Sequence, residues 1–347
     1  MPETKYITTF IFSLMLLIGT ALILPAHSLA TQEYVFTGKT MGTTYSIKLV
    51  SAKPLSESLW QEKIDLRLKQ VNARLSMYQK DSELSRFNAA PKNRPFRVSS
   101  DFYQVLEQCR NLYTLTSGAW DGTVKPLVDL WGFGTKGRRA TPPEPGEIKA
   151  LLKTIGFNKL DIGDHILTKT MSGITLDLGS IAKGYGVDEI ARLIRDGGVE
   201  NYLVEIGGEL AGAGVNKHRK AWIVGIANPE KGILNSGLCK EVRLDNKAIA
   251  TSGNYRNYFE KNGRIYSHII SPKTGYPVEN AVVSASVISD TCTRADGLAT
   301  ALMVMDTGKA IALINSLDNT ECLIIRQDGA KKTVLRSSGF KSYEIGF

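Results

Sequence analysis

Histidine and cysteine are scarce in this chain, and their scarcity argues against several kinds of enzyme. The 347 residues include four histidines, and no two of those beyond the N-terminal segment, His165, His218 and His268, have the spacing of a zinc site. The four cysteines include no CxxC pair, so neither a redox motif nor a zinc ribbon is present. A Walker lysine motif and a GxSxG nucleophile elbow are also absent. The sequence therefore disfavours a zinc hydrolase, a P-loop enzyme and an α/β-hydrolase.

Long hydrophobic runs are also lacking, apart from one at the N-terminus. Lys5 precedes the apolar run at 10–25, and the small residues Ser28 and Ala30 follow it. This order is typical of a secretory signal over residues 1–30, which predicts a mature domain over 31–347. The alternative is an uncleaved anchor, but the run is shorter than the ~18 to 20 residues that a membrane span needs. The segment contains no cysteine, so lipid attachment through cysteine is excluded.

An exported chain meets an oxidising compartment, where its cysteines could pair. Cys109, Cys239, Cys292 and Cys322 allow three disulfide pairings, and their spacing favours none of them. Four buried thiols are the alternative.

Charge of one sign does not dominate. The net charge of +9 comes from 43 basic and 34 acidic residues that are interleaved along the chain, which favours anionic ligands only weakly. The basic run at 136–139 lies in a Pro/Gly-rich stretch, 134–146, that we interpret as a solvated loop. No nucleic-acid partner is expected.

Hydrophobic periodicity predicts a mixture of helices and strands. Apolar residues recur at helical spacing from Ile64 to Leu75, and a second helix, capped by Ser100 or Asp101, should end at the turn 117–122. The remaining expected elements are strands at 37–50, 173–179, 201–208, 220–229, 240–252 and 281–289, a hairpin turning at 262–263, and helices at 180–198 and 291–305. Tight turns join several strands, so we predict an α+β fold with much antiparallel pairing rather than a doubly wound sheet.

The segment LDLGSIAKGYG at 176–186 has the strongest physical signal for a ligand site. Its three glycines each cost a helix about 1 kcal/mol relative to alanine, which indicates that a ligand or a neighbouring backbone comes close. A helix that begins near Ile181 would direct free N–H groups and its positive dipole end outward, and Lys183 would add a full charge. The segment predicts a diphosphate cradle; a tightly packed turn with a surface lysine is the alternative.

Two polar residues on an otherwise apolar helix predict a metal site. Asp296 and Thr300 are four residues apart and so share one helical face. Both are oxygen ligands suited to Mg²⁺, which commonly takes only one or two protein carboxylates. A hydroxyl that bonds the helix backbone is the alternative for Thr300. His268 stands where a strand runs into a Pro/Gly turn, a place where functional side chains are often presented.

Eight ordered blocks of the sequence, taken together, closely resemble the ApbE family, the FAD:protein FMN transferases. The blocks cover nearly all of the chain after residue 30, at 40–47, 75–88, 117–134, 176–188, 204–210, 250–259, 267–278 and 292–302. The resemblance implies an ApbE-like, T-fold-related architecture with a largely antiparallel sheet and packed helices. It further implies Mg²⁺-dependent transfer of the FMN half of FAD to a threonine or serine hydroxyl of an acceptor protein, with release of AMP.

The resemblance also implies roles for particular residues. Mg²⁺ would lie between the main-chain carbonyl of Ser180 and the side chains of Asp296 and Thr300; family members often have alanine at the Ser180 position, a difference that a main-chain ligand should tolerate. The expected FAD-binding residues are Met41, Tyr78, Ala119, Trp120, Asp121, Asp177, Lys183 and His268. Lys183 would neutralise developing charge, and His268 would accept the proton of the attacking hydroxyl, with Asp177 as the alternative base.

Two other functions stay open at this point. A periplasmic FAD diphosphatase would use the same ligand and metal with water as the acceptor, and a flavin-binding or flavin-delivery protein would need no metal ligands. Many bacterial family members carry a lipid-anchoring cysteine after the signal, which this chain lacks, so we expect a free periplasmic protein. By resemblance, its acceptors are subunits of membrane respiratory or electron-transfer complexes.

Overall fold

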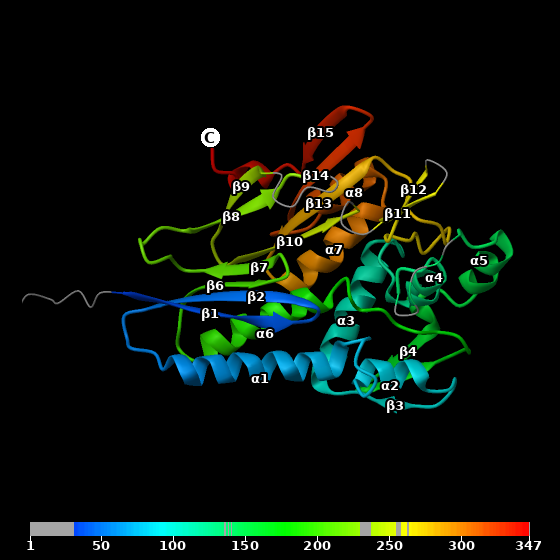
Figure 1. Ribbon diagram of the computed structural model, residues 1–347, viewed down its shortest axis with the longest axis horizontal. Helices are drawn as coiled ribbons and strands as arrows, with labels where there is room; N and C mark the ends of the chain where they lie inside the picture. The colour runs from blue at the N-terminus through cyan, green and yellow to red at the C-terminus, as the bar shows by residue number, and fades with distance from the viewer. Residues whose placement is uncertain are drawn as a thin grey trace, which may run out of the picture. The chain divides into compact units, whose positions relative to one another are not determined.

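An eight-stranded antiparallel sheet forms the centre of the fold. The computed structural model describes residues 31–134, 137, 139, 141–229, 237–254, 258–261 and 264–346. The strand order in the sheet is β1-β2-β6-β7-β10-β13-β14-β15, and every neighbouring pair is antiparallel (Figure 1). The strands are β1 (Gln32–Thr40), β2 (Thr43–Ser51), β6 (Asn201–Ile206), β7 (Glu209–Ala213), β10 (Lys247–Gly253), β13 (Val282–Ser289), β14 (Glu321–Asp328) and β15 (Lys331–Arg336).

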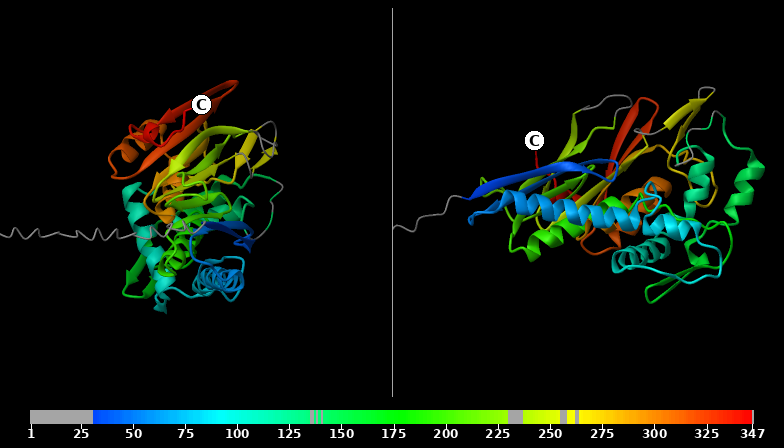
Figure 2. Two further views of the ribbon diagram at one scale, coloured as in Figure 1. Left: turned by 90° about the vertical axis from the view of Figure 1, so that its left-hand side faces the viewer. Right: turned by 60° about the horizontal axis from the view of Figure 1, so that its bottom comes forward.

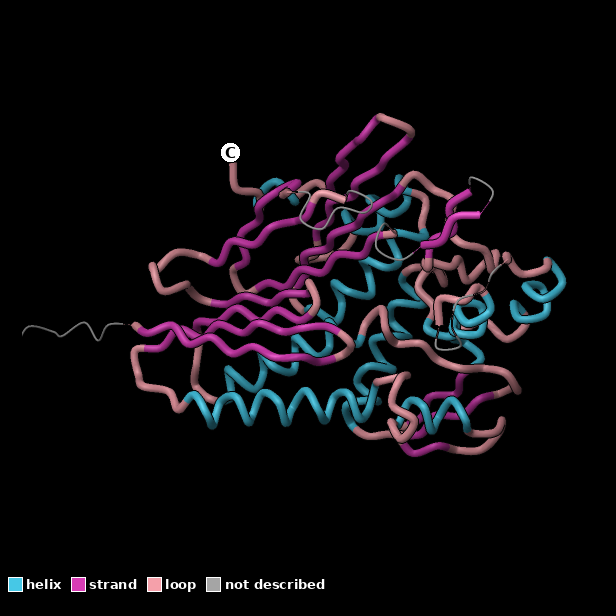
Figure 3. The backbone as a smooth tube through the Cα atoms, in the orientation of Figure 1, coloured by secondary structure: helices cyan, strands magenta, loops and turns pink. Residues whose placement is uncertain are grey.

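Long helices, drawn in cyan in Figure 3, cover one face of this sheet, whose strands are magenta. They are α1 (Glu57–Leu75), α3 (Ser100–Leu115), α6 (Ala182–Asp196), α7 (Cys292–Val304) and α8 (Thr307–Asn315). The apolar stripe of α1 is buried as its spacing predicts, and Ile64 packs in one cluster with Phe36 of β1 and Ile190 of α6. Helix α7 packs against β10 and β13, with Leu298 and Leu302 in the main core.

A hairpin covers part of the opposite face (Figure 2). It consists of β8 (Trp222–Ala227) and β9 (Leu238–Leu244), which pair with each other. Alternate residues of β8 are buried, and Val224 packs in one cluster with Ile249 of β10 and Ile288 of β13. The central strands of the sheet are therefore buried on both faces, while the helical face carries the site described below.

Shorter elements surround the ends of the long helices. They are α2 (Glu83–Ala89), β3 (Phe96–Arg97), α4 (Lys125–Leu130), α5 (Pro145–Leu152), β4 (Leu160–Gly163), β5 (Ile166–Lys169), β11 (Tyr258–Lys261) and β12 (Arg264–Ser267). Strands β3, β5 and β4 form a small separate sheet, and β11 pairs with β12. The predicted hairpin is thus confirmed by the Lys261 to Arg264 pairing, although its turn at 262–263 lies outside the described residues.

The α+β prediction with antiparallel pairing is confirmed, but two single strands were predicted where hairpins occur. The prediction of a single strand at 37–50 is wrong, because the chain reverses at Met41 (φ 50°) and Gly42 (φ 72°) between β1 and β2. The strand at 240–252 likewise turns at Asn246 (φ 51°) between β9 and β10. Neither turn contains a proline, and so the apolar alternation continued across both.

The predicted strand at 173–179 is also wrong, because this segment belongs to no sheet. The segment is hydrogen-bonded differently: the amide side chain of Asn88 both donates to the carbonyl of Leu176 (2.8 Å) and accepts from its N–H (2.7 Å). The N–H of Asp177 donates to the carbonyl of Gly122 (2.8 Å). A side chain and a loop thus supply the bonds of a neighbouring strand. The cap of α3 is Ser99, which precedes both predicted positions, Ser100 and Asp101.

Two further predictions concern cysteines and the membrane. All four cysteines are free thiols, with Cys239 half-buried and the other three buried, so the disulfide alternative is wrong. The predicted signal over 1–30 lies outside the described residues. Within the part of the chain that the structure describes, no helix is both long and apolar enough to cross a bilayer.

Candidate functional site

Two adjoining cavities at the ends of α1, α6 and α7 contain all of the predicted site residues. The first, which we call the Asp296 cavity, has a volume of about 380 Å³. The second, the Met41 cavity, has a volume of about 900 Å³ and shares Met77, Tyr78, Gly179 and Lys183 with the first. Met41 lines the second cavity, and the other predicted residues all line the first: Tyr78, Ala119, Trp120, Asp121, Asp177, Ser180, Lys183, His268, Asp296 and Thr300.

The glycine-rich start of α6 is explained by a neighbouring backbone. A Cβ at Gly184 would lie 2.4 Å from the carbonyl oxygen of Cys292, so only glycine allows α7 to approach α6 so closely. A Cβ at Gly186 would meet the side chain of Met41 at 2.8 Å. Of the two reasons that the sequence offered for these glycines, close packing of a neighbouring backbone therefore accounts for Gly184.

The first turns of α6 and α7 are each capped by a carboxylate of the other helix. Asp296 of α7 accepts from the N–H of Gly184 through Oδ2 (3.0 Å). Asp188 of α6 accepts from the N–H groups of Cys292 and Thr293, each at 2.8 Å, and from the Thr293 hydroxyl. The prediction that α6 directs free N–H groups outward is therefore corrected, because the Gly184 N–H is satisfied within the protein.

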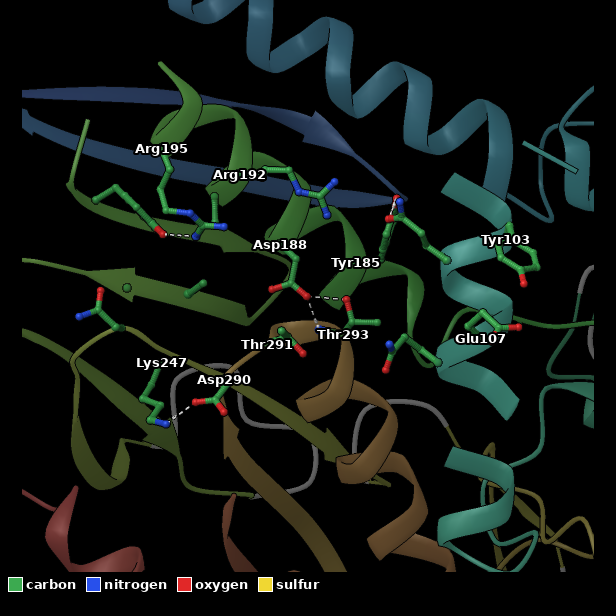
Figure 4. A pocket seen from close by; sticks show the side chains of 17 residues that line it. Tyr103, Glu107, Tyr185, Asp188, Arg192, Arg195, Lys247, Asp290, Thr291 and Thr293 are labelled. Carbon is green, nitrogen blue, oxygen red and sulfur yellow. Dashed lines mark hydrogen bonds and ion pairs between the residues drawn. The ribbon is translucent and has the colours of Figure 1, made fainter. Parts of the chain in front are cut away.

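Asp188 faces away from the predicted site. It lines a third cavity, of about 420 Å³, on the other side of the α6–α7 pair, where Figure 4 shows it bonded to Thr293 near Arg192 and Tyr185. None of the predicted site residues lines this cavity.

A lysine and two buried carboxylates form the charged centre of the Asp296 cavity. The Nζ of Lys183 lies 3.1 Å from Oε1 of Glu209 and 3.8 Å from Oδ2 of Asp296. Burial lowers the pKa of Lys183, but the charges of Asp296 and Glu209 outweigh burial and keep this pKa above its usual value. Burial and then the charge of Asp296 raise the pKa of Glu209 above its usual value. The ammonium group therefore stays charged beside two competing carboxylates.

Sequence reasoning missed Glu209. It lies in the block at 204–210, directly after Gly207 (φ 63°) and Gly208 (φ 104°), which form the turn between β6 and β7. An acidic residue that follows such a turn and opens a largely buried strand was a usable signal, because buried carboxylates need a partner.

The arrangement around Asp296 and Thr300 suits a hard cation. Asp296 is 3% exposed, and the hydrogen bond described for its carboxylate uses Oδ2 and not Oδ1. The hydroxyl of Thr300 lies 3.0 Å from the Ser252 hydroxyl, so the predicted alternative of a bond to its own helix backbone is not what the structure shows. No group of three or more His, Cys, Asp or Glu side chains placed to hold a metal occurs among the described residues. The expected set of one carboxylate, one hydroxyl and one carbonyl would not form such a group, and its oxygen donors fit Mg²⁺.

The turn before α4 forms one wall of this cavity. Trp120 is buried, and its indole N–H donates to Oγ of Ser180 (3.1 Å). Asp121 lines the cavity, but both of its oxygens are bonded within the protein, Oδ1 to Thr123 and Oδ2 to the N–H of Phe157 (3.2 Å). The geometry thus gives Asp121 a part in holding the wall together.

Both candidate bases line the Asp296 cavity. Asp177 accepts from the N–H of Gly179 through Oδ1 (2.8 Å), and burial raises the pKa of its carboxyl group. His268 follows β12, and its ring packs edge-on against Phe133, with 6.3 Å between the two ring centroids. Tyr78 is 74% exposed, at the boundary of the two cavities. The geometry does not separate His268 from Asp177.

Comparison with known proteins places these residues within one family. The model of the ApbE family matches residues 41–324. An FAD:protein FMN transferase of Vibrio cholerae is 40% identical over 327 residues, covering 94% of this chain and 97% of that protein. The protein of the same name from Haemophilus influenzae is 39% identical, covering 93% of this chain and 95% of that protein. The solved structure of the flavin transferase ApbE from Vibrio cholerae superposes with a TM-score of 0.82 at 39% identity, over 90% of this chain and 99% of that one.

Proposed function

This chain belongs to the ApbE family, and we propose that it transfers the FMN half of FAD to a threonine or serine hydroxyl of an acceptor protein, with Mg²⁺ required and AMP released. Two relatives that are about 40% identical over nearly their whole length carry the name FAD:protein FMN transferase. One observation carries the proposal. The eleven residues that the family resemblance implies come from segments spread over the chain, yet all of them line two adjoining cavities.

The proposal assigns the metal to three residues. The main-chain carbonyl of Ser180 and the side chains of Asp296 and Thr300 would hold Mg²⁺, and all three residues line the same cavity. When bound, Mg²⁺ would neutralise charge on the diphosphate and orient it. Oδ1 of Asp296 accepts no hydrogen bond from the part of the chain that the structure describes, which supports this role, because the Gly184 N–H holds the carboxylate by its other oxygen.

The reaction exchanges the phosphoanhydride bond of FAD for a phosphoester bond to the acceptor. The acceptor hydroxyl oxygen attacks the phosphorus of the FMN half of FAD, and the bond from this phosphorus to the bridging oxygen breaks. AMP leaves with that oxygen and the electron pair of the broken bond. We assign the hydroxyl proton to His268, whose ordinary pKa of about 6.5 suits a base near neutrality, with Asp177 as the alternative. Lys183 balances negative charge on the departing phosphate, since phosphoryl transfer depends largely on positioning and electrostatics.

We further propose where the reaction takes place. The N-terminal segment has the pattern of a secretory signal, so the enzyme would act in the periplasm as a free protein. Acceptors there would be subunits of membrane respiratory or electron-transfer complexes that carry covalent flavin.

The test combines the mature protein with FAD, Mg²⁺ and a threonine-bearing acceptor subunit. Intact mass spectrometry and in-gel flavin fluorescence of the acceptor should show one added FMN, and AMP should appear in equal amount. An acceptor with valine in place of its threonine serves as the control and should stay unmodified. Free FMN and AMP without a modified acceptor would contradict the transferase proposal and indicate a diphosphatase.

A further inference from the structure

Glu209 presents a buried carboxylate oxygen that has no partner in the Asp296 cavity. The side chain is only 3% exposed, and its Oε1 lies 3.1 Å from the Nζ of Lys183. Its other oxygen, Oε2, is buried and accepts no hydrogen bond from any residue that the structure describes. Glu209 lines the cavity beside Asp296, although it is not among the residues that the family resemblance implied.

An ion pair with Lys183 alone does not account for this arrangement. A pair would satisfy Oε1 and leave Oε2 desolvated, which is costly for a charged oxygen. The cluster also contains two acidic side chains and only one ammonium group, so Lys183 cannot balance both of them fully. A cation in the cavity, with water around it, would supply both the missing charge and the missing hydrogen-bond donor.

We infer that Glu209 belongs to the outer shell of the metal site, where its Oε2 accepts a hydrogen bond from a water in the coordination shell of the cation. The inference rests on the proposed function, which assigns the inner ligands to Ser180, Asp296 and Thr300. Mg²⁺ usually keeps several waters when it binds to protein, so outer-shell acceptors are expected around it. Residues that act in this way typically change metal affinity by about 10- to 100-fold.

Glu209 also keeps Lys183 away from Asp296. The Nζ of Lys183 is 3.8 Å from Oδ2 of Asp296, farther than from Oε1 of Glu209. Without the Glu209 carboxylate, the ammonium group would have Asp296 as its remaining acidic partner of this cluster and would compete with the metal there. Removing Glu209 should therefore lower metal affinity in two ways, by the loss of the outer-shell acceptor and by the competition of Lys183 for Asp296.

Mn²⁺ binding tests the inference without measuring turnover. The mature protein is titrated with Mn²⁺ alone, without FAD, and free Mn²⁺ is followed by electron paramagnetic resonance. Glu209→Gln keeps the shape of the side chain but removes its charge and should weaken Mn²⁺ binding by about 10- to 100-fold. Glu209→Ala, checked for folding by circular dichroism, should do the same.

Glu83 provides a matched control. It is also 3% exposed and has a buried Oε2 without a hydrogen bond, but it lies in α2 and lines neither the Asp296 cavity nor the Met41 cavity. Glu83→Gln should therefore leave Mn²⁺ affinity unchanged. Equal losses in the two Gln variants would overturn the inference, because the effect would then come from burial and not from the site.

A Lys183→Met background separates the two effects of Glu209. If Oε2 acts on the metal shell, Glu209→Gln should still weaken Mn²⁺ binding when Lys183 is absent. An effect that disappears in this background overturns the outer-shell assignment, as does unchanged affinity of the single variant. A wild-type protein that binds no Mn²⁺ would instead overturn the proposed metal site, and this inference with it.

Discussion

Asp188 and Asp296 occupy reciprocal positions on two packed helices, and each carboxylate accepts hydrogen bonds from the first turn of the helix that carries the other. These reciprocal hydrogen bonds fix the position of α7 along the axis of α6. They also orient Asp296, because the Gly184 N–H holds one of its oxygens while the other accepts no hydrogen bond from the described residues. The cap that Asp188 provides, on the far side of the helix pair, should therefore influence the position of Asp296.

Removing the Asp188 carboxylate should affect metal use as well as stability. Asp188→Ala leaves the N–H groups of Cys292 and Thr293 without their acceptor, which should cost about 1–3 kcal/mol in the free energy of unfolding. It should also raise the Mg²⁺ concentration needed for half-maximal FMN transfer. The control is Asp306→Ala, which removes the N-cap of α8 and should cost about 1 kcal/mol without changing the Mg²⁺ requirement. Identical Mg²⁺ requirements in the two variants would contradict the link between Asp188 and the site.

Replacing Asp296 should abolish metal binding while the fold is kept. Asp296→Asn retains an oxygen for the Gly184 N–H but loses the charge that holds the cation. We expect the rate of FMN transfer to fall by about 10²- to 10³-fold, as for the loss of one group that stabilises the transition state. The measurement is turnover against Mg²⁺ concentration in chelator-treated buffer, with circular dichroism as the folding check. Normal turnover of this variant in that buffer would refute the metal assignment.

The pH dependence of turnover should identify the base. A base works only when it is deprotonated, so the rate should rise with pH through the pKa of the group that serves. If His268 is the base, the wild-type rate should show such a step and His268→Ala should lose it. Asp177→Asn is the comparison, since burial raises the pKa of Asp177 above that of an ordinary carboxyl group. A step that persists in His268→Ala and disappears in Asp177→Asn would assign the proton to Asp177.

Ser180→Ala should keep metal binding, because the expected ligand is the main-chain carbonyl. The substitution removes the Oγ that accepts from the indole N–H of Trp120 at 3.1 Å, which should lower the free energy of unfolding by about 0.5–1.5 kcal/mol. Mn²⁺ affinity and the unfolding midpoint in urea are the two measurements. Loss of Mn²⁺ affinity in a folded variant would place the hydroxyl, and not the carbonyl, on the metal.

The buried thiols should make the protein less stable at alkaline pH. Burial raises the pKa of Cys322 to about 12, whereas an unfolded cysteine has a pKa of about 8.5. Between these values the unfolded chain loses the proton and the folded chain keeps it, so unfolding becomes more favourable by about 1.4 kcal/mol per pH unit. Urea unfolding of wild type and Cys322→Ala at pH 8 and pH 10 should show a smaller loss for the variant. Parallel losses would mean that Cys322 titrates normally in the folded protein.

Local patterns in the sequence predicted the helices α1, α3, α6 and α7, but not α2, α4, α5 and α8. The buried stripe from Ile64 to Leu75 belongs to α1, and the glycine-rich junction leads into α6 at the predicted place. Periodicity reports which face of a helix is buried, and packing of that face decides most of its stability. The turns at Met41 and Asn246 were missed, because the apolar alternation is the same on both sides of each turn.

Partners that are distant in the sequence could not be predicted. The extended segment before α6 bonds the side chain of Asn88, and Glu209 meets Lys183 and Asp296, each in a different element. No periodic signal marks such contacts, since the elements involved are joined only by tertiary packing. The family resemblance brought together residues that local patterns left separate, but it gave no role to Glu209.

The hydrogen bonds between α6 and α7 join residues that are 104 to 112 positions apart. After α6 is synthesised, the ribosome must therefore still make β6 to β13 before Asp296 is available to the first turn of α6. Until then Gly184 has no α7 packed against it, and Lys183 has no Asp296 beside it. A polypeptide that ends before Cys292 should consequently be inactive, even if the strands that precede this residue pair correctly.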